Sequence, residues 1–313
     1  MPSRLAVHQD AALEGISVAY QPAGLIAAQL VPNVPVKFES DKYYVYSKDN
    51  LKVPNTRRAD GAESREVDWD LTTATYVLEE EALKRLVTDR QRENADAAIR
   101  PEVDATKFLT GQILLRHEQD LADLINPAAN WSTKTSLTST LAWSANTTLS
   151  NPIAVADSAS AAILQGTGKR PNRCLLDLRT FNAAKEHVSV VDRIKYTSAD
   201  SVTPALLGRL FNVEKLLVAE AAVNSGQQGQ ADSMGFIFTD LAFFCYVAQS
   251  PSLMEPSALY TFGKSGMGLD GGQARVKRWR EEKRNGDFIE ASKMYQHKIV
   301  ASDCAFHVAN TVQ

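Results

Sequence analysis

The longest unbroken helical pattern of apolar residues runs from residue 101 to residue 125. Pro101 suits the first position of a helix, and Leu109, Ile113 and Leu121 fall on overlapping faces at helical spacing. Asn126-Pro127 ends the pattern, because the residue before a proline avoids the helical region. At 1.5 Å per residue the helix would be about 37 Å long, which predicts the spine of a domain.

Weaker patterns flank this helix. Leu83, Leu86 and Val87 stand at helical spacing and predict another helix over residues 79–92. Within the long helix, the adjacent pair His117-Glu118 is interpreted as part of a solvated face. Residues 128–149 are rich in Ser, Thr and Asn and predict a loop with short strand pieces, one of them at 141–143.

A long polar hairpin is predicted between residues 37 and 78. Residues 42–46 are rich in strand formers, and residues 65–71 alternate charge and bulk with period two. Seven basic residues oppose eight acidic ones, and a hairpin this polar would not hold itself together in water. Two interpretations stay open: a solvated surface hairpin, or an arm that pairs with a neighbouring subunit. The second gives as interface candidates Lys48, Lys52, Arg57, Arg58, Asp60, Glu63, Arg65 and Glu66.

The second half of the chain alternates short helices and strands. The predicted helices are 152–164 (ended by Gly166), 179–187 and 204–211, and the predicted strands are 174–176, 213–219, 235–238 and 241–247. This order predicts a small α/β domain over about residues 170–270. Two closing strands, 275–282 and 287–298, flank Asn285-Gly286, which is a strong hairpin signal.

The N-terminal 36 residues are apolar but broken by prolines and a glycine, so they predict an arm that is buried against the body or against another chain. The first residues lack the pattern of a secretory signal. The longest apolar run, 236–248, is shorter than the roughly 20 residues of a membrane helix. The protein is therefore expected to stay in a cytoplasm, away from membranes.

Composition and charge narrow the partners. The chain has 313 residues, 44% hydrophobic and 23% charged, which excludes a disordered or collagen-like protein. Its net charge is −3, which argues against a protein that coats nucleic acid. A basic cluster surrounds Trp279, and on a strand Arg278 and Arg280 share one face. They form either a DNA contact on an inner surface or a mixed-charge strand edge that resists aggregation.

No motif predicts an enzyme, a metal site or a cofactor. Gly263-Lys264-Ser265 lacks the glycine that a phosphate loop needs five residues earlier, where Ala258 stands. The histidines lack metal-binding spacing. The cysteines have neither disulfide nor zinc spacing and are expected to be buried reduced thiols: Cys174, Cys245 and Cys304.

The order of these parts resembles the major capsid protein of tailed bacteriophages. The likeness is strongest over residues 130–313, and the N-terminal part matches by layout more than by residues. The residues that carry it are Trp143-Ser144, Asn151-Pro152-Ile153, the stretches 168–172 (Gly-Lys-Arg-Pro-Asn), 181–187, 192–196 and 210–213, and Ala248-Gln249-Ser250-Pro251-Ser252.

The resemblance implies an α+β, Hong Kong 97-like capsid fold. Its parts would be an N-terminal arm (1–36), an extended hairpin loop (37–78), a peripheral domain with the spine helix (79–169), an axial α/β domain (170–272) and return strands to the peripheral domain (273–313). The hairpin would lie over the neighbouring subunit. The function implied is self-assembly into hexamers and pentamers of an icosahedral head around double-stranded DNA, which the shell would enclose without tight binding.

The resemblance also implies partners and a location. Scaffolding would come from a separate protein, a portal protein would join the shell, and a decoration protein is a further candidate partner. The subunit would assemble in the host bacterial cytoplasm and end in the virion. None of Lys42, Lys48 and Lys52 is assigned to a covalent crosslink. The alternatives are an encapsulin-like compartment shell and a small α/β enzyme.

Overall fold

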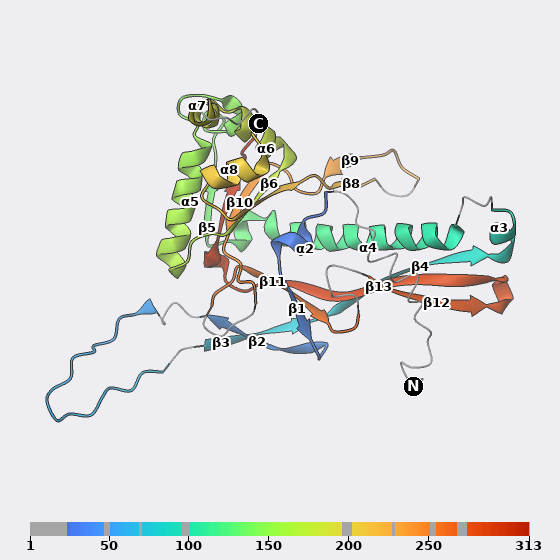
Figure 1. The fold of residues 1–313 in the computed structure, drawn as a ribbon, viewed down its shortest axis with the longest axis horizontal. Coiled ribbons are helices and arrows are strands. Elements are labelled where there is room, and N and C mark those ends of the chain that lie inside the picture. The colour runs from blue at the N-terminus through green and yellow to red at the C-terminus, as the bar shows by residue number, and fades with distance from the viewer. Residues whose placement is uncertain are drawn as a thin grey trace.

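The computed structural model describes residues 24–46, 51–68, 71–95, 100–195, 202–226, 229–250, 255–267 and 274–312. Residues 1–23 of the predicted arm lie outside this part of the chain. Figure 1 shows a compact lobe that carries α5 to α8, a flat extended sheet with the long helix α4 along it, and a hairpin loop that reaches away from both.

The extended sheet is built around one long strand, β13 (Gly286–Ile299). The sheet order is β1-β11-β13-β12, and β4 also pairs with β13. The bounds of these strands are β1 Asn33–Val36, β4 Glu79–Thr88, β11 Leu259–Lys264 and β12 Arg275–Glu281. The predicted closing strands are confirmed, but a 3-10 turn, η5 (Glu282–Arg284), joins them before Asn285 takes a left-handed conformation. Gly286 is required next, because a Cβ atom there would lie 2.6 Å from the carbonyl oxygen of Val87.

Residues 79–88 form a strand, so the helix predicted over 79–92 is wrong for most of its length. All ten residues of β4 pair with β13, from Glu79 opposite Tyr295 to Thr88 opposite Gly286. Pairing with a buried strand outweighs the helical spacing of a few leucines, because strand formation depends on context more than on propensity. Only α3 (Asp89–Glu93) is helical there, and a capping box between Thr88 and Gln91 starts it.

The predicted spine helix is confirmed as α4 (Pro101–Ile125). The loop after it holds η3 (Ala128–Asn130), β5 (Thr133–Ser136) and η4 (Trp143–Ala145). The strand piece predicted at 141–143 is therefore absent, and Trp143 is instead a buried residue in a 3-10 turn.

The compact lobe holds a second sheet of order β5-β14-β10-β6-β7. Its other strands are β6 Arg173–Asp177, β7 Lys215–Ala219, β10 Leu241–Cys245 and β14 Ala305–Ala309, the last of which follows η6 (Ser302–Cys304). Its helices are α5 Pro152–Thr167, α6 Leu178–Glu186, α7 Val188–Ile194 and α8 Pro204–Leu210. A separate ribbon pairs β8 (Ala222–Asn224) with β9 (Met234–Phe236).

The small α/β unit is present, but its sheet recruits strands from outside the predicted range of 170–270. β5 comes from the loop after the spine helix, and β14 from the C-terminal residues that we expected to return with the closing strands. The bounds of α5 follow from local signals. Asn151 accepts hydrogen bonds from the N–H groups of Ile153 and Ala154 at its start. Gly168, in a left-handed conformation, ends the helix two residues after the predicted stop.

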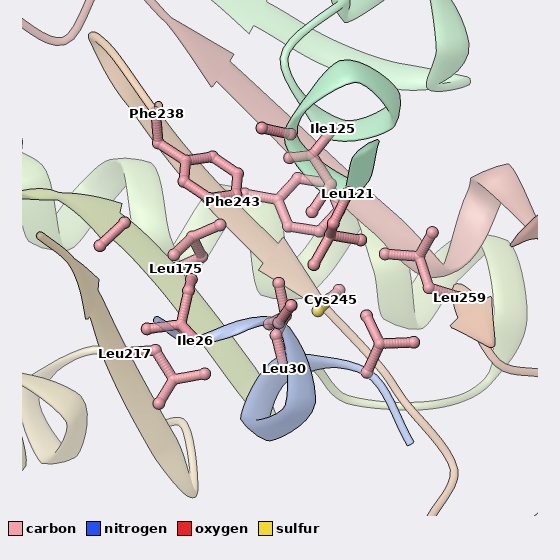
Figure 2. Close-up of a cluster of buried hydrophobic side chains, with 14 of the residues drawn as sticks. Ile26, Leu30, Leu121, Ile125, Leu175, Leu217, Phe238, Phe243, Cys245 and Leu259 are labelled. Atoms are coloured by element: carbon pink, nitrogen blue, oxygen red, sulfur yellow. The ribbon is translucent and has the colours of Figure 1, made fainter. Parts of the chain in front are cut away.

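The largest hydrophobic core joins the two sheets. It packs α2 (Ala27–Leu30) and the end of α4 against the compact sheet, and Figure 2 shows Leu30, Leu121, Leu175 and Phe243 converging there. The three cysteines are free and buried, as expected. Among the described residues, no helix is both long and apolar enough to cross a membrane.

Candidate assembly surfaces

The predicted hairpin exists as β2 (Ser40–Tyr46) paired with β3 (Leu71–Val77). The two strands form a sheet of their own, in a register that sets Ser40 opposite Val77 and Tyr46 opposite Leu71. The second strand starts at Leu71, later than predicted, and residues 65–68 are exposed and lie outside any strand. Alternation of charge and bulk does not by itself make a strand when no partner strand lies beside it.

Aromatic contacts fix the base of the hairpin to the extended sheet. Tyr76, only 4% exposed, stacks on Phe262 of β11 with ring centroids 4.7 Å apart, and Tyr43 lies 5.1 Å from the same ring. The Oε1 atom of Gln296 accepts the N–H of Val77 at 2.9 Å. Lys264 pairs with Glu39. The base is therefore part of the folded body.

The tip of the hairpin, residues 51–68, has no core of its own. Every residue in it is exposed, including Val53 at 94%. Arg58 donates to the carbonyl oxygen of Ala62, so part of the tip is ordered by its own contacts. Seven of the eight interface candidates lie here, and Lys48 lies outside the described residues: Lys52, Arg57, Arg58, Asp60, Glu63, Arg65 and Glu66.

Arg278 and Arg280 occupy the same face of β12, as expected, and both bind carboxylates of this chain. Arg278 reaches Asp287 at 2.6 Å and Glu102 at 3.0 Å. Arg280 makes a bidentate pair with Asp89, at 2.6 Å to each oxygen. Burial of Asp287 opposes ionisation, but hydrogen bonds from Arg278 and Arg92 hold its pKa below the usual value.

These ion pairs favour the mixed-charge strand edge over the DNA contact. In the described sheet β12 pairs with β13 alone, so it is an edge strand. Two guanidinium groups that already bind carboxylates attract phosphates less strongly than free ones. The sequence analysis did not identify Asp89, Arg92 and Glu102 as members of this charged cluster. They lie on α3 and α4, which only the fold brings next to β12.

A buried polar cluster lies where α4 crosses β13, and it overturns one sequence interpretation. His117 and Glu118 are buried, not part of a solvated helix face. Glu118 accepts the N–H groups of Ile26 and Ala27, and burial raises its pKa to about 7. From β13, Lys293 is wholly buried, and burial lowers its pKa to about 7.

Two histidines complete this cluster. His297 shares a hydrogen bond with Thr261 at 2.8 Å and lies 3.1 Å from the carbonyl oxygen of His117. Burial lowers the pKa of His297 to about 4 and that of His117 well below its usual value, so both are neutral near pH 7. Beside the cluster, a cavity of about 170 Å³ is lined by Glu79, Glu81, Asp120, Leu124, Tyr295, Gln296 and His297.

No group of His, Cys, Asp or Glu in the described ranges is arranged to hold a metal ion. Tyr295 donates to Asp120 at 2.5 Å, and Arg116 pairs with the same carboxylate at 2.9 Å, so this acid already has partners. The candidate assembly surface is instead the projecting hairpin tip.

Two curated proteins are similar to this chain in sequence. It is 28% identical over 312 residues to the major capsid protein of Pseudomonas phage JBD67, covering 97% of each protein. It is 29% identical over 265 residues to the major capsid protein of Burkholderia phage BcepMu, covering 82% of this chain and 84% of the relative. No family model matches the chain.

Solved structures share the fold. A phage-related protein from Bordetella bronchiseptica matches with a TM-score of 0.74 at 24% identity, covering 97% of this chain and 98% of that one. The capsid of cyanophage P-SCSP1u matches with a TM-score of 0.60 at 12% identity, covering 90% and 86%. An encapsulin complex from Synechococcus elongatus matches with a TM-score of 0.55 at 12% identity, covering 98% and 97%.

The sequence likeness and the fold agree. The chain therefore has the Hong Kong 97-like fold, and its similarity in sequence to phage major capsid proteins supports a role as a capsid shell subunit.

Proposed function

We propose that the chain self-assembles into hexamers and pentamers that close into an icosahedral phage head around double-stranded DNA. The observation that carries this proposal is the hairpin, whose base is packed into the body while its tip has no core. A monomer gains nothing from exposing Val53 and Val67 at the end of such a projection, whereas a neighbour could bury them.

In the proposed shell the tip lies over the adjacent subunit, and the charged residues of the tip pair across that contact. The mixed signs of Arg57, Asp60 and Glu63 suit a surface that carries both charges. The division into arm, hairpin, peripheral domain, axial domain and return strands, at the boundaries expected from sequence, belongs to this proposal.

The proposed partners follow from the same role. A separate scaffolding protein guides assembly in the host bacterial cytoplasm, a portal protein joins the shell, and a decoration protein is a further candidate. The inner surface of the proposed shell holds DNA weakly, because Arg278 and Arg280 bind carboxylates of their own chain and the net charge of the chain is −3.

A deletion of residues 50–63 tests the role of the tip. The variant is expected to keep its secondary structure and melting transition but to form no closed shells in electron micrographs, while the full chain forms them. A control variant with the order of residues 50–63 scrambled keeps the length and charge of the tip. It separates the effect of specific contacts from the effect of the size of the tip. Normal shells from the deletion variant would overturn the proposed contact.

The encapsulin match supports a second candidate function, a compartment shell that holds protein cargo. Particles purified from phage-infected and from uninfected cells distinguish the two. Double-stranded DNA inside particles from infected cells supports the phage head, and a stoichiometric enzyme inside particles from uninfected cells supports the compartment.

A further inference from the structure

A short segment, residues 25–31, crosses the junction between the two sheets, and we refer to it as the strap. It contains the single-turn helix α2, which Figure 1 shows lying across α4. Ile26, Ala27, Leu30 and Val31 are buried, and Figure 2 shows Ile26 and Leu30 among side chains of α4 and the compact sheet. The strap therefore links both halves of the molecule to the N-terminal part of the chain.

Two side chains from different elements hold the two ends of the strap by hydrogen bonds. The carboxylate of Glu118, from α4, accepts the N–H of Ala27 at 2.8 Å and that of Ile26 at 3.1 Å. The guanidinium of Arg173, from β6, donates to the carbonyl oxygens of Gln29, at 2.8 Å, and Leu30. The single turn leaves these backbone groups without intrahelical partners, and the two side chains satisfy them.

Glu118 is held in an unusual way for a buried acid. It is 1% exposed, and in the described part of the chain no cation lies within 4 Å of its oxygens. The facing cation, Lys293 of β13, is wholly buried, and its Nζ atom has no hydrogen-bond partner among the described residues. A carboxylate removed from water without a cation in contact favours its neutral form.

The other groups around Glu118 do not replace a contacting cation. His117 on α4 and His297 on β13 are neutral, since burial lowers the pKa of each. Tyr295 is bound to Asp120, and Arg173 lies at the opposite end of the strap. The charged and titratable groups on the surrounding elements are His117 and Glu118 of α4, Arg173 of β6, and Lys293, Tyr295 and His297 of β13, with the buried thiols of Cys245 and Cys304 in the same hydrophobic core.

We propose that the strap is a proton-dependent latch: its docked form takes up a proton on Glu118, so the strap is held firmly in mildly acidic solution and loosens above neutral pH. In the docked form burial raises the pKa of Glu118 to about 7, against the ordinary value of 4.5 that water restores on release. Between these values the docked form binds more protons, so raising the pH weakens docking. The docking equilibrium is expected to fall about 10- to 100-fold from pH 5 to pH 8.

Hydrogen exchange of the Ile26 and Ala27 amides in the unassembled full-length chain tests the latch. After correction for intrinsic exchange rates, protection in the wild type should fall with rising pH. In Glu118→Gln, whose amide oxygen still accepts an N–H and carries no charge, protection at pH 8 should match the wild-type value at pH 5. The control Asp120→Asn alters a neighbouring acid that contacts Tyr295 and Arg116, and it should keep the wild-type pH profile.

Three results would overturn the latch: a pH-independent wild type, a Glu118→Gln profile equal to that of the wild type, or weaker protection of Glu118→Gln at every pH. If Glu118→Gln does not fold, isotope-edited infrared spectroscopy of the wild type decides, because an ionised Glu118 at pH 5.5 also contradicts the proposal. The measurement needs no shell, so its failure leaves the proposed function untouched, and a chain that forms no shells can still have the latch.

Discussion

The two halves of the contact between α4 and β13 are built from different chemistry. Towards the start of α4, Leu109 and Ile113 pack with Ile289 and Ala291 in a purely apolar cluster. About one turn beyond Ile113 on the same helix, His117 and Glu118 meet Lys293, Tyr295 and His297. The first half is held by packed volume, which no change in pH alters. The second is held by groups whose protonation decides its stability, so one interface combines a constant joint with a tunable one.

The largest effect is expected in the apolar half. Ile113→Ala removes a side chain that is 1% exposed and leaves a cavity, so the free energy of unfolding should fall by about 2–5 kcal/mol. Urea denaturation of the unassembled chain at pH 5, 7 and 9 measures it. The loss should be equal at the three pH values, and a loss that changes with pH would show that the two halves are coupled.

In the polar half, Lys293→Met should stabilise the protein by a few kcal/mol at pH 6, since burial penalises the charged form of Lys293, whose Nζ atom has no hydrogen-bond partner among the described residues and lies 5.3 Å from the Tyr295 ring. Burial lowers the pKa of Lys293 from 10.5 to about 7, so the unfolded chain binds more protons between these values. The advantage of the variant is full below pH 7 and disappears as the pH rises towards 10.5. A destabilised variant at pH 6 would show that the cation has a partner that stabilises it.

His297 governs the acid range of the stability profile. Its pKa, lowered to about 4, makes its contribution complete above pH 6.5, and this contribution is lost as the pH falls through 4. Glu118 acts in the reverse direction between pH 4.5 and 7, so the wild-type slope is partly cancelled. In the Glu118→Gln background the loss of unfolding free energy on acidification across this range should grow by about 3 kcal/mol. Chemical denaturation between pH 4 and 7 measures it, and an unchanged slope would contradict the assigned protonation states.

The smallest effect is expected at the exposed ion pairs. Arg280→Gln removes the bidentate pair with Asp89, whose pKa the Arg280 hydrogen bonds lower. Because salt screens exposed pairs, the variant should melt slightly below the wild type at low ionic strength and together with it at about 0.5 M salt. Calorimetry at two salt concentrations is sufficient. A large loss at both concentrations would mean that the edge of β12 depends on this pair for its packing.

The parts of the fold that the sequence predicts well are those that local signals specify. Pro101 and Asn126 bracket α4, and Asn151 and Gly168 bracket α5, because caps and breakers act within a few residues. β4 was mistaken for a helix because its pairing partner lies some 200 residues away in the chain, in β13. β5 and β14 also join the compact sheet through pairings between segments that lie far apart in the chain.

The candidate surfaces divide in the same way. The exposed, charged tip of the hairpin could be anticipated, since a polar stretch without apolar periodicity cannot form a core. The burial of Glu118 could not, because its neighbours on α4 do not reveal that the strap and β13 cover it. An acid directly after a histidine in a long amphipathic helix has the same local pattern whether water or another segment faces it.

The long strand β13 determines how mechanical force passes through the subunit. The hairpin base is attached to Phe262 of β11 and, through Val77, to Gln296 of β13. β13 in turn pairs with β11, β4 and β12. A pull on the tip is thus transferred along the strand axis, where many backbone hydrogen bonds share the load in shear and must break together. Tension at the hairpin therefore passes through β2 and β3 into the extended sheet, whose strands share the load.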